Sequence, residues 1–403
     1  MRMWFAVIRV LLVPSSDYVG HPFPQRHNQL FERLHDEKYF EVHVVRFRLY
    51  EEPNLKTSLI LHELEGRRAK SLSCYYLINA VDHANQIRRI ARQENIDVIV
   101  LSNLGAPLAF TLMDQLSSLR VSIVFDLPDY YPTSAAGYIF NVKSTFGKLF
   151  AGVLDLTLQY MIRHSNLVTV ASCALAEYAK NAGASNVVRI PNGISEDFLR
   201  LHDGNGIREK LGYSHEDFVT GYIGSVEFWL DMRSLVKAVA IARKQGVPAK
   251  LLIVGRKLQT GYSKKVANWI IQDGLEKHTT WLNFVPHEEV PKYIAGLDVG
   301  TIPFDILNPT AYYAAPNKMW EYLSQQKPVI AAPIPEVLKN SDSMLLASVQ
   351  LEWANKLLLA TKRSEEIVRK IATGYKKALN YTWEKSVERL KSELYSLINR
   401  TPA

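Results

Sequence analysis

The strongest constraint on this chain is an alternation of short, apolar, β-branched runs with longer segments of helical period. Such alternation with short loops is typical of parallel sheets whose two faces are both covered by helices. It occurs in two successive blocks, separated by the turn-forming sequence Pro191-Asn192-Gly193. We therefore predict an α/β protein of two Rossmann-like, doubly wound domains that face each other across a cleft.

The runs define the expected elements. The expected strands are Ala6–Val13, Phe40–Phe47, Val98–Ser102, Val121–Phe125, Leu167–Ala171, Val219–Ile223, Lys250–Val254, Thr280–Phe284, Val299–Pro303 and Pro328–Ala332. The expected helices are His27–His35, Val81–Gln93, Met232–Gln245, Ser263–Asp273, His287–Ile294, Lys318–Ser324 and Trp383–Leu397. Trp4–Val13 has the length of a signal-peptide core. Arg9 interrupts it, however, and no small-residue cleavage site follows, so we expect a first strand there.

The length of 403 residues fits two domains. We expect an N-terminal domain at residues 1–193 and a second domain at 194–380. Residues 381–403 should form a helix that is capped by Thr382 and could cross back to the first domain.

Composition excludes several classes of function. The net charge is +8, but no run of five or six like charges is present, so we expect no nucleic-acid partner. The two cysteines, Cys74 and Cys173, read as core residues of a protein in a reducing compartment. His and Cys clusters suited to zinc are absent from the sequence, and we expect neither a metal nor a resident cofactor.

One helix start in the second half is chemically distinctive. Pro316 and Asn317 lead into a helix whose first turn holds Lys318, where a cation opposes the helix dipole. A bound phosphate would explain that placement, and Glu321, one turn later, could accept hydrogen bonds from a ribose diol. The alternative is an ordinary helix start with a solvated lysine and glutamate.

This segment resembles the signature of the retaining family-4 glycosyltransferases of the GT-B fold, in the form P-N-K-x-x-E-Y-L followed by K-P-V. Four other segments resemble the same family in the expected order. They are Val168–Ile194, Thr220–Ser225, Leu251–Gly255 and Trp281–Pro303. Each motif alone is weak, whereas the ordered set is specific and covers nearly the whole chain.

The resemblance implies transfer of a sugar from a nucleotide diphosphate to an acceptor hydroxyl with retained anomeric configuration. It places the donor mainly in the second domain. The residues that match the family's donor-binding positions are Gly224, Ser225, Phe284, Val285, Ala315, Pro316, Asn317, Lys318 and Glu321.

The sequence departs from the family pattern at charged positions. The first glutamate of the family's pair falls at Tyr313. The cations that many members place after the glycine loop fall at Ser225 and Leu230. Arg256 or Lys257, or Lys318 itself, would then have to neutralise the diphosphate; the alternative for Arg256 and Lys257 is a solvated loop.

The first half should hold the acceptor and catalytic side. Asp126 and Asp129 follow an expected buried strand at its carboxyl end, where one of them could accept the acceptor's proton or orient sugar hydroxyls. The alternative is turn capping. Gly20 matches the first of a family glycine pair near the diphosphate, and His21, which replaces the second, could contact an anionic substrate.

A long, largely apolar segment, Tyr138–Arg163, carries scattered cations such as Lys148. It could lie against a membrane surface, as a lipid-linked acceptor would require. The alternative is a helix buried on the sheet.

These patterns together favour a hexosyltransferase that adds a hexose or an N-acetylhexosamine to a glycan or a lipid-linked glycan. Two alternatives stay open: a non-catalytic sugar-nucleotide-binding relative or partner subunit, and a sugar-nucleotide epimerase on the same fold. We expect a cytoplasmic protein, with peripheral contact at the cytoplasmic membrane face as a variant of that location.

Overall fold

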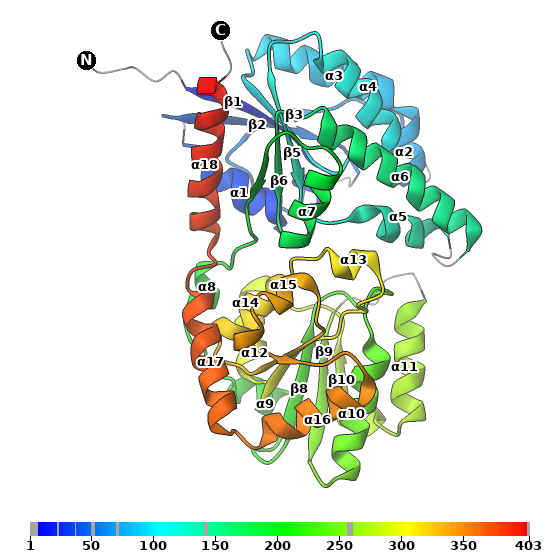
Figure 1. The fold of residues 1–403 in the computed structure, drawn as a ribbon, viewed down its shortest axis with the longest axis vertical. Coiled ribbons are helices and arrows are strands. Elements are labelled where there is room, and N and C mark those ends of the chain that lie inside the picture. The colour runs from blue at the N-terminus through cyan, green and yellow to red at the C-terminus, as the bar shows by residue number, and fades with distance from the viewer. Residues whose placement is uncertain are drawn as a thin grey trace. The chain divides into compact units, whose positions relative to one another are not determined.

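The computed structural model describes residues 7–21, 24–36, 38–49, 53–69, 72–140, 144–255 and 261–400. Arg256 and Lys257, two of the expected donor-site cations, lie outside the described residues. The chain forms two compact units (Figure 1): Met1–Pro191 with Trp383–Ala403, and Asn192–Thr382. No helix in the described part of the chain is both long and apolar enough to cross a membrane.

The first unit contains a parallel sheet in the order β3-β2-β1-β4-β5-β6-β7. Its strands are β1 (Ile8–Val13), β2 (Phe40–Arg46), β3 (Ile60–Glu63), β4 (Val98–Leu101), β5 (Ser122–Leu127), β6 (Leu167–Val170) and β7 (Val187–Arg189). Its helices are α1 (Arg26–Leu34), α2 (Leu72–Ile78), α3 (Ala80–Gln93), α4 (Ala106–Leu116), α5 (Tyr131–Ile139), α6 (Thr145–Arg163), α7 (Cys173–Asn181) and α18 (Trp383–Arg400).

The last helix of the chain, α18, packs into the core of this first unit. The ring of Tyr395 lies edge-on against Phe40 of β2, with 4.9 Å between the ring centroids. Trp383, Leu390 and Leu394 are buried in the same cluster as strands β1 and β2. Burial of these large side chains stabilises the attachment of the helix.

The second unit has a parallel sheet in the order β10-β9-β8-β11-β12-β13. Its strands are β8 (Phe218–Ile223), β9 (Ala249–Val254), β10 (Thr279–Leu282), β11 (Val299–Ile302), β12 (Val329–Ala331) and β13 (Leu345–Leu346). Its α-helices are α8 (Glu196–Leu199), α9 (Asn205–Lys210), α10 (Met232–Lys244), α11 (Tyr262–Gln272), α12 (Val290–Ala295), α13 (Pro309–Tyr312), α14 (Asn317–Ser324), α15 (Pro335–Leu338), α16 (Gln350–Thr361) and α17 (Glu365–Ala378). Three 3-10 turns join them: η1 (Glu276–His278), η2 (His287–Glu289) and η3 (Ser341–Ser343).

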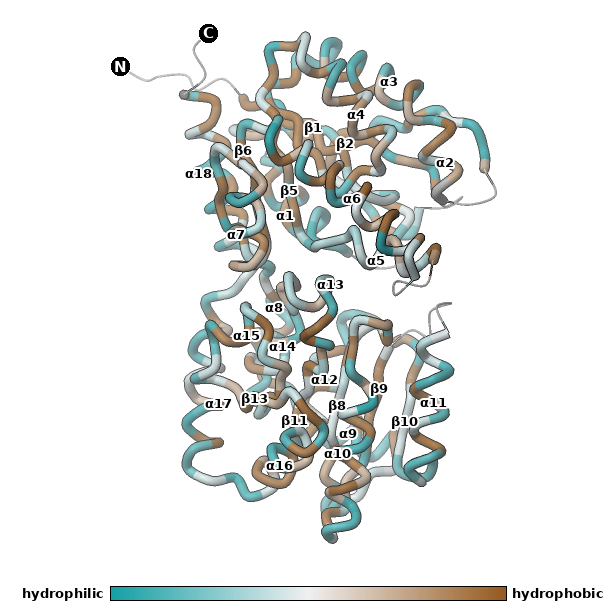
Figure 2. The backbone as a smooth tube through the Cα atoms, turned by 45° about the vertical axis from the view of Figure 1, so that its right-hand side comes forward, coloured by the Kyte–Doolittle hydropathy of each residue, from teal (hydrophilic) through white to brown (hydrophobic). Residues whose placement is uncertain are grey.

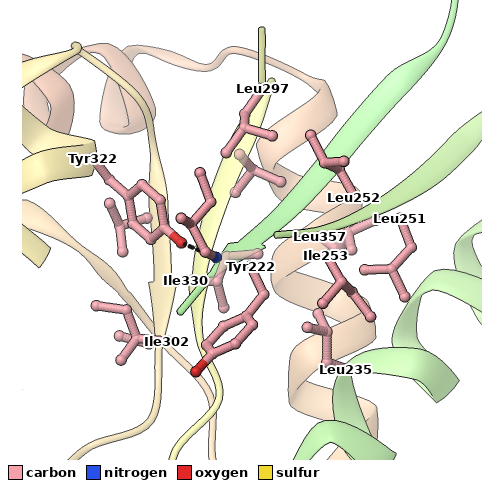
Figure 3. Packing of buried hydrophobic residues seen from close by; sticks show 14 of the residues in the cluster. Tyr222, Leu235, Leu251, Leu252, Ile253, Leu297, Ile302, Tyr322, Ile330 and Leu357 are labelled. Carbon is pink, nitrogen blue, oxygen red and sulfur yellow. Dashed lines mark hydrogen bonds between the residues drawn. The ribbon is translucent and has the colours of Figure 1, made fainter. Parts of the chain in front are cut away.

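The core of the second unit lies between its sheet and the helices that cover it. Figure 3 shows Leu235 of α10 and Leu357 of α16 close to Leu251, Leu252 and Ile253 of β9. Strands buried in this way read as continuous apolar runs, which is why the sequence identifies them. The predicted doubly wound α/β fold is confirmed in both units.

Both sheets reverse their strand order at the first strand. β1 pairs with β2 on one side and β4 on the other, and β8 pairs with β9 and β11. In open α/β sheets ligands bind beyond the carboxyl ends of the strands at such switch points. A ligand site in the second unit is therefore expected at the loops after β8 and β11.

Candidate functional site

Two glycines bring together the loops that follow β8 and β9. Gly224 ends β8 with a φ of 143°, a conformation that glycine alone adopts readily. Its N–H donates to Val254 O over 2.8 Å. A Cβ on Gly255 would lie 1.9 Å from the carbonyl oxygen of Gly224, so the two backbones can approach only without a side chain there. The sequence indicated the glycine loop at Thr220–Ser225 and the segment Leu251–Gly255 without revealing this contact.

Lys318, in the first turn of α14, reaches to the same point. A Cβ on Gly224 would meet Cε of Lys318 at 3.0 Å and Nζ at 3.3 Å. The ammonium group also lies 5.5 Å from the ring centroids of both Tyr222 and Phe304. The Lys318 ammonium group is therefore surrounded by residues from the end of β8 and from the loop after β11. The two aromatic faces stabilise its charge.

The start of α14 has the features of an anion site. Pro316 occupies the N-cap position and no side chain caps the helix. Oδ1 of Asn317 is buried and accepts no hydrogen bond from the described residues. An uncapped helix N-terminus beside a lysine favours an anionic ligand. Ala315, just before the cap, is fixed by Asn192, whose Nδ2 donates to its carbonyl oxygen over 3.3 Å.

Glu321 lies one turn beyond Lys318 and is partly buried. Loss of hydration raises the pKa of its carboxyl group, while the nearby charges of His287 and Lys318 lower it. A carboxylate held in this way can accept hydrogen bonds from two adjacent hydroxyls.

The loop after β10 contains the two residues expected to contact a base. β10 ends at Leu282, so the predicted strand Thr280–Phe284 is too long and Phe284 lies in the loop. The side chain of Phe284 is 59% exposed and available for stacking, whereas that of Val285 is buried in the core. Only the backbone of Val285 could reach a ligand.

Tyr222 and Tyr322 are the residues that sequence reasoning missed in this unit. The Tyr222 hydroxyl donates to the carbonyl oxygen of Ser225 over 2.7 Å and so fixes the glycine loop. The backbone N–H of Ile223 donates to the Tyr322 hydroxyl over 2.9 Å, the bond drawn in Figure 3. Both tyrosines lie in apolar runs, and only the tertiary contacts distinguish them from ordinary core residues.

The structure also has uncharged side chains at two positions where the family pattern has charged ones. Tyr313 ends α13 and is half-buried, so this position has an aromatic ring in place of a carboxylate. The side chain of Ser225 is exposed and uncharged. No group of three or more His, Cys, Asp or Glu side chains within the described ranges could hold a metal ion.

In the first unit, the backbone of Gly20, an expected donor contact, is hydrogen-bonded within the protein. The N–H of Gly20 donates to Oδ1 of the buried Asp17 over 2.9 Å, and its carbonyl oxygen accepts from Asn54 over 2.6 Å. Both backbone groups are therefore occupied. His21 lies next to Gln25, with 3.1 Å between His21 Nε2 and Gln25 Nε2.

Asp126 and Asp129 have different environments. Arg26 donates to both carboxylate oxygens of Asp126 over 3.1 Å, His27 Nε2 lies 3.2 Å away, and Thr169 donates over 2.7 Å. Burial alone would raise the pKa of Asp126, but the charge of Arg26 and the nearby ring of His27 outweigh it and hold the pKa well below its usual range.

Asp126 is therefore ionised near neutral pH and anchors Arg26, an environment that favours a positioning role over that of a base. Asp129, three residues later, is exposed, and its backbone oxygen accepts from Asn103 over 3.3 Å. Of the two residues, Asp129 is exposed and Asp126 is buried.

One family model and several solved structures are similar to this chain. Residues 217–374 match the family model described as glycosyl transferases group 1. No curated protein matches the chain by sequence. Among solved structures, a sucrose-phosphate synthase from Thermosynechococcus elongatus is similar with a TM-score of 0.78 at 14% identity, covering 98% of this chain and all of that one.

Two further structures have the same fold. Anabaena HepE in complex with UDP and glucose has a TM-score of 0.73 at 16% identity, with coverage of 96% of this chain and 100% of that chain. WaaG, described as a glycosyltransferase involved in lipopolysaccharide biosynthesis, has a TM-score of 0.67 at 12% identity, with coverage of 95% and 98%. At these identities the likeness shows the fold.

Proposed function

We propose that this chain, of which residues 217–374 match the glycosyl transferases group 1 model, is a retaining glycosyltransferase. It moves a hexose or an N-acetylhexosamine from a nucleotide diphosphate sugar to a glycan or a lipid-linked glycan. The observation that carries this proposal is the meeting of Gly224, Gly255 and Lys318 beyond the carboxyl ends of β8 and β9. A diphosphate needs such close backbone approach together with a positive charge.

Each part of the donor has a proposed partner in the second unit. Lys318 and the uncapped start of α14 hold the diphosphate. Glu321, one turn further along α14, accepts hydrogen bonds from the ribose hydroxyls. Phe284 stacks on the base, and the backbone of Val285 lies at its edge. Ser225 and Ala315 contribute to the two loops that border the phosphates.

The proposed reaction separates the sugar from a stabilised leaving group. The bond between the anomeric carbon and the diphosphate oxygen breaks, and its electron pair leaves with the diphosphate. The acceptor oxygen then bonds to the same face of that carbon and gives up its proton to the released diphosphate or to a carboxylate. Lys318 contributes mainly by stabilising the charge that develops on the diphosphate.

In the first unit we assign the acceptor side to Asp129. Asp129 is exposed at the carboxyl end of β5, whereas Asp126 is buried and accepts hydrogen bonds from Arg26 and Thr169. Asp129 either receives the acceptor's proton or orients a sugar hydroxyl. Asp126 positions Arg26 and His27 without taking part in proton transfer.

One observation supports a second candidate function. The position of Tyr313, where related sequences have a glutamate, has no carboxylate for the sugar. A protein with this change could bind a sugar nucleotide without transferring the sugar. Donor binding with neither transfer nor donor hydrolysis would favour this non-catalytic alternative.

The test begins with thermal unfolding in the presence of UDP, GDP, ADP, TDP and their common sugars. UDP and UDP-glucose come first because HepE binds them in solved complexes. We expect one nucleotide to stabilise the protein and Glu321→Ala to abolish the shift. Glu366→Ala, an exposed glutamate in the first turn of α17, is the control and should behave like the wild type. Absence of any shift at millimolar nucleotide contradicts the proposed donor site.

A further inference from the structure

The first unit carries a large exposed apolar surface on the hairpin formed by α5 and α6. We call it the apolar hairpin face. It consists of Tyr138, Ile139, Phe140, Phe146, Leu149, Val153 and Leu156. Figure 2 shows brown, hydrophobic stretches along these two helices. Contiguous exposed apolar side chains of this number are unusual on a soluble protein and indicate an interaction surface.

The spacing of these residues makes the surface continuous along α6. Phe146, Leu149, Val153 and Leu156 recur at intervals of three and four residues, which places them on one side of the helix. Phe146 is 75% exposed, Leu149 67% and Leu156 64%. The buried side of α6 faces the unit through a separate set, Leu154, Leu158, Met161 and Ile162. The core therefore does not account for the exposed stripe.

The exposed charged residues of α5 and α6 are both positive, namely Lys148 and Arg163. α5 and α6 together contain a single acidic residue, Asp155. The Asp155 carboxylate accepts from the hydroxyls of Tyr130 and Tyr178 over 2.8 and 2.7 Å and from Gln159 over 2.7 Å, so it is directed toward the protein. Lys148 is exposed between Phe146 and Leu149 in the sequence of α6. Its long apolar stem can lie along the surface while the ammonium group reaches polar headgroups.

We propose that the apolar hairpin face docks on a lipid surface that carries anionic headgroups. Its aromatic and aliphatic side chains enter the boundary between headgroups and acyl chains, as an amphipathic interfacial helix does. Lys148 meets the lipid phosphates, and Tyr138 has the amphipathic ring that suits this boundary. A second copy of the same face would bring like charges together, so the charge pattern favours an anionic lipid surface. The proposal does not depend on the sugar-transfer function.

The test is flotation of the full chain with vesicles of phosphatidylcholine, with or without phosphatidylglycerol. We expect binding to the mixed vesicles and clearly weaker binding to phosphatidylcholine alone. Leu149→Asp combined with Leu156→Asp should weaken binding to the mixed vesicles about tenfold or more, because two buried aliphatic contacts are lost. Lys148→Glu should abolish the preference for the anionic vesicles.

The matched control is Leu351→Asp on α16 of the second unit, where the leucine is also 64% exposed. It should bind as the wild type does, and far-ultraviolet circular dichroism should show that every variant is folded. Equal binding of the double variant and the control overturns the proposal, as does equal binding to the two kinds of vesicle. A concentration-dependent dimer that the double variant abolishes in analytical ultracentrifugation, without lipid binding by the wild type, assigns the face to a second copy instead.

Discussion

Gly255 lies so close to Gly224 that a Cβ on Gly255 would stand 1.9 Å from the Gly224 carbonyl oxygen. Both atoms belong to backbone, so no side-chain rotation relieves the clash. Gly255→Ala should destabilise the protein by about 1–3 kcal/mol and weaken nucleotide binding, because the two loops must separate. Urea unfolding and nucleotide-dependent thermal shifts measure the two effects.

Gly206→Ala is the control for that substitution. A Cβ on Gly206, in α9 of the same unit, meets nothing within 4 Å. Alanine favours a helix over glycine by up to about 1 kcal/mol, so this variant should equal or exceed the wild type in stability. If Gly255→Ala is as stable as Gly206→Ala and binds nucleotide equally well, the close contact has no role.

We expect Lys318 to contribute to the affinity for the nucleoside diphosphate and not to that for the uncharged nucleoside. Its Nζ lies over the rings of Tyr222 and Phe304, beside Gly224. Lys318→Met should lower the affinity for the nucleoside diphosphate about tenfold to a hundredfold, the loss expected for one charge-assisted contact. Titration calorimetry with the diphosphate and with the uncharged nucleoside separates the two contributions.

Lys292→Ala, an exposed lysine of α12, is the control for the overall charge of the unit. It should leave both affinities unchanged. An equal loss for nucleoside and diphosphate in Lys318→Met would mean that the lysine supports the fold of the site and does not contact phosphate.

The sequence was a good guide to buried strands and a poor one to edge strands. All ten strands expected from apolar runs correspond to strands of the structure, with ends that shift by one or two residues. Three short edge strands were missed, namely β3, β7 and β13. β3 and β7 have no fully buried residue, and β13 contains only Leu345 and Leu346. An edge strand with so few buried residues gives a weak apolar signal. β10 is also an edge strand without a fully buried residue, and the sequence did predict it.

The candidate site was predictable only where a local motif defines it. The order Pro316-Asn317-Lys318 with Glu321 one turn later is visible in the sequence because a helix start is a local feature. The pairing of Asp126 with Arg26 spans 100 positions, and no local pattern indicates it. The sequence therefore identified Asp126 as polar and well placed, but it could not show that its oxygens were occupied.

Asp126 and Asp129 should respond in opposite ways to the same substitution. Asp126→Asn removes the carboxylate that pairs with the buried guanidinium of Arg26, so it should cost about 3–5 kcal/mol of stability. Asp129→Asn changes an exposed side chain and should leave stability within about 0.5 kcal/mol of the wild type. It should nevertheless reduce sugar transfer.

Chemical unfolding and a transfer assay on each variant check this pair. Retained stability in Asp126→Asn contradicts its role as an anchor. Full activity in Asp129→Asn removes it from the acceptor side. Because the folded-state pKa of Asp126 is lowered, its contribution to stability is present at neutral pH and is lost only as the pH falls below the usual range of an aspartate.

His83 of α3 should make the first unit sensitive to mild acid. Its ring is fully buried, and neither ring nitrogen has a hydrogen-bond partner among the described residues. Burial lowers the pKa of His83 from 6.5 to about 4, with a small opposing effect of Asp82. Between these two values the unfolded chain binds a proton that the folded protein does not. Stability should therefore fall as the pH drops from about 6.5 to about 4, by up to about 3 kcal/mol in total.

His83→Phe tests this directly, because Phe47 and Tyr75 already surround the ring and can accept another aromatic side chain. As the pH is lowered through this range, the unfolding free energy of the variant should rise relative to that of the wild type. His62 and His278 also have lowered pKa values, through burial first, so both proteins should retain a shared, smaller acid sensitivity. A difference that stays constant from pH 7 to pH 4 would show that His83 does not titrate differently in the folded and unfolded states.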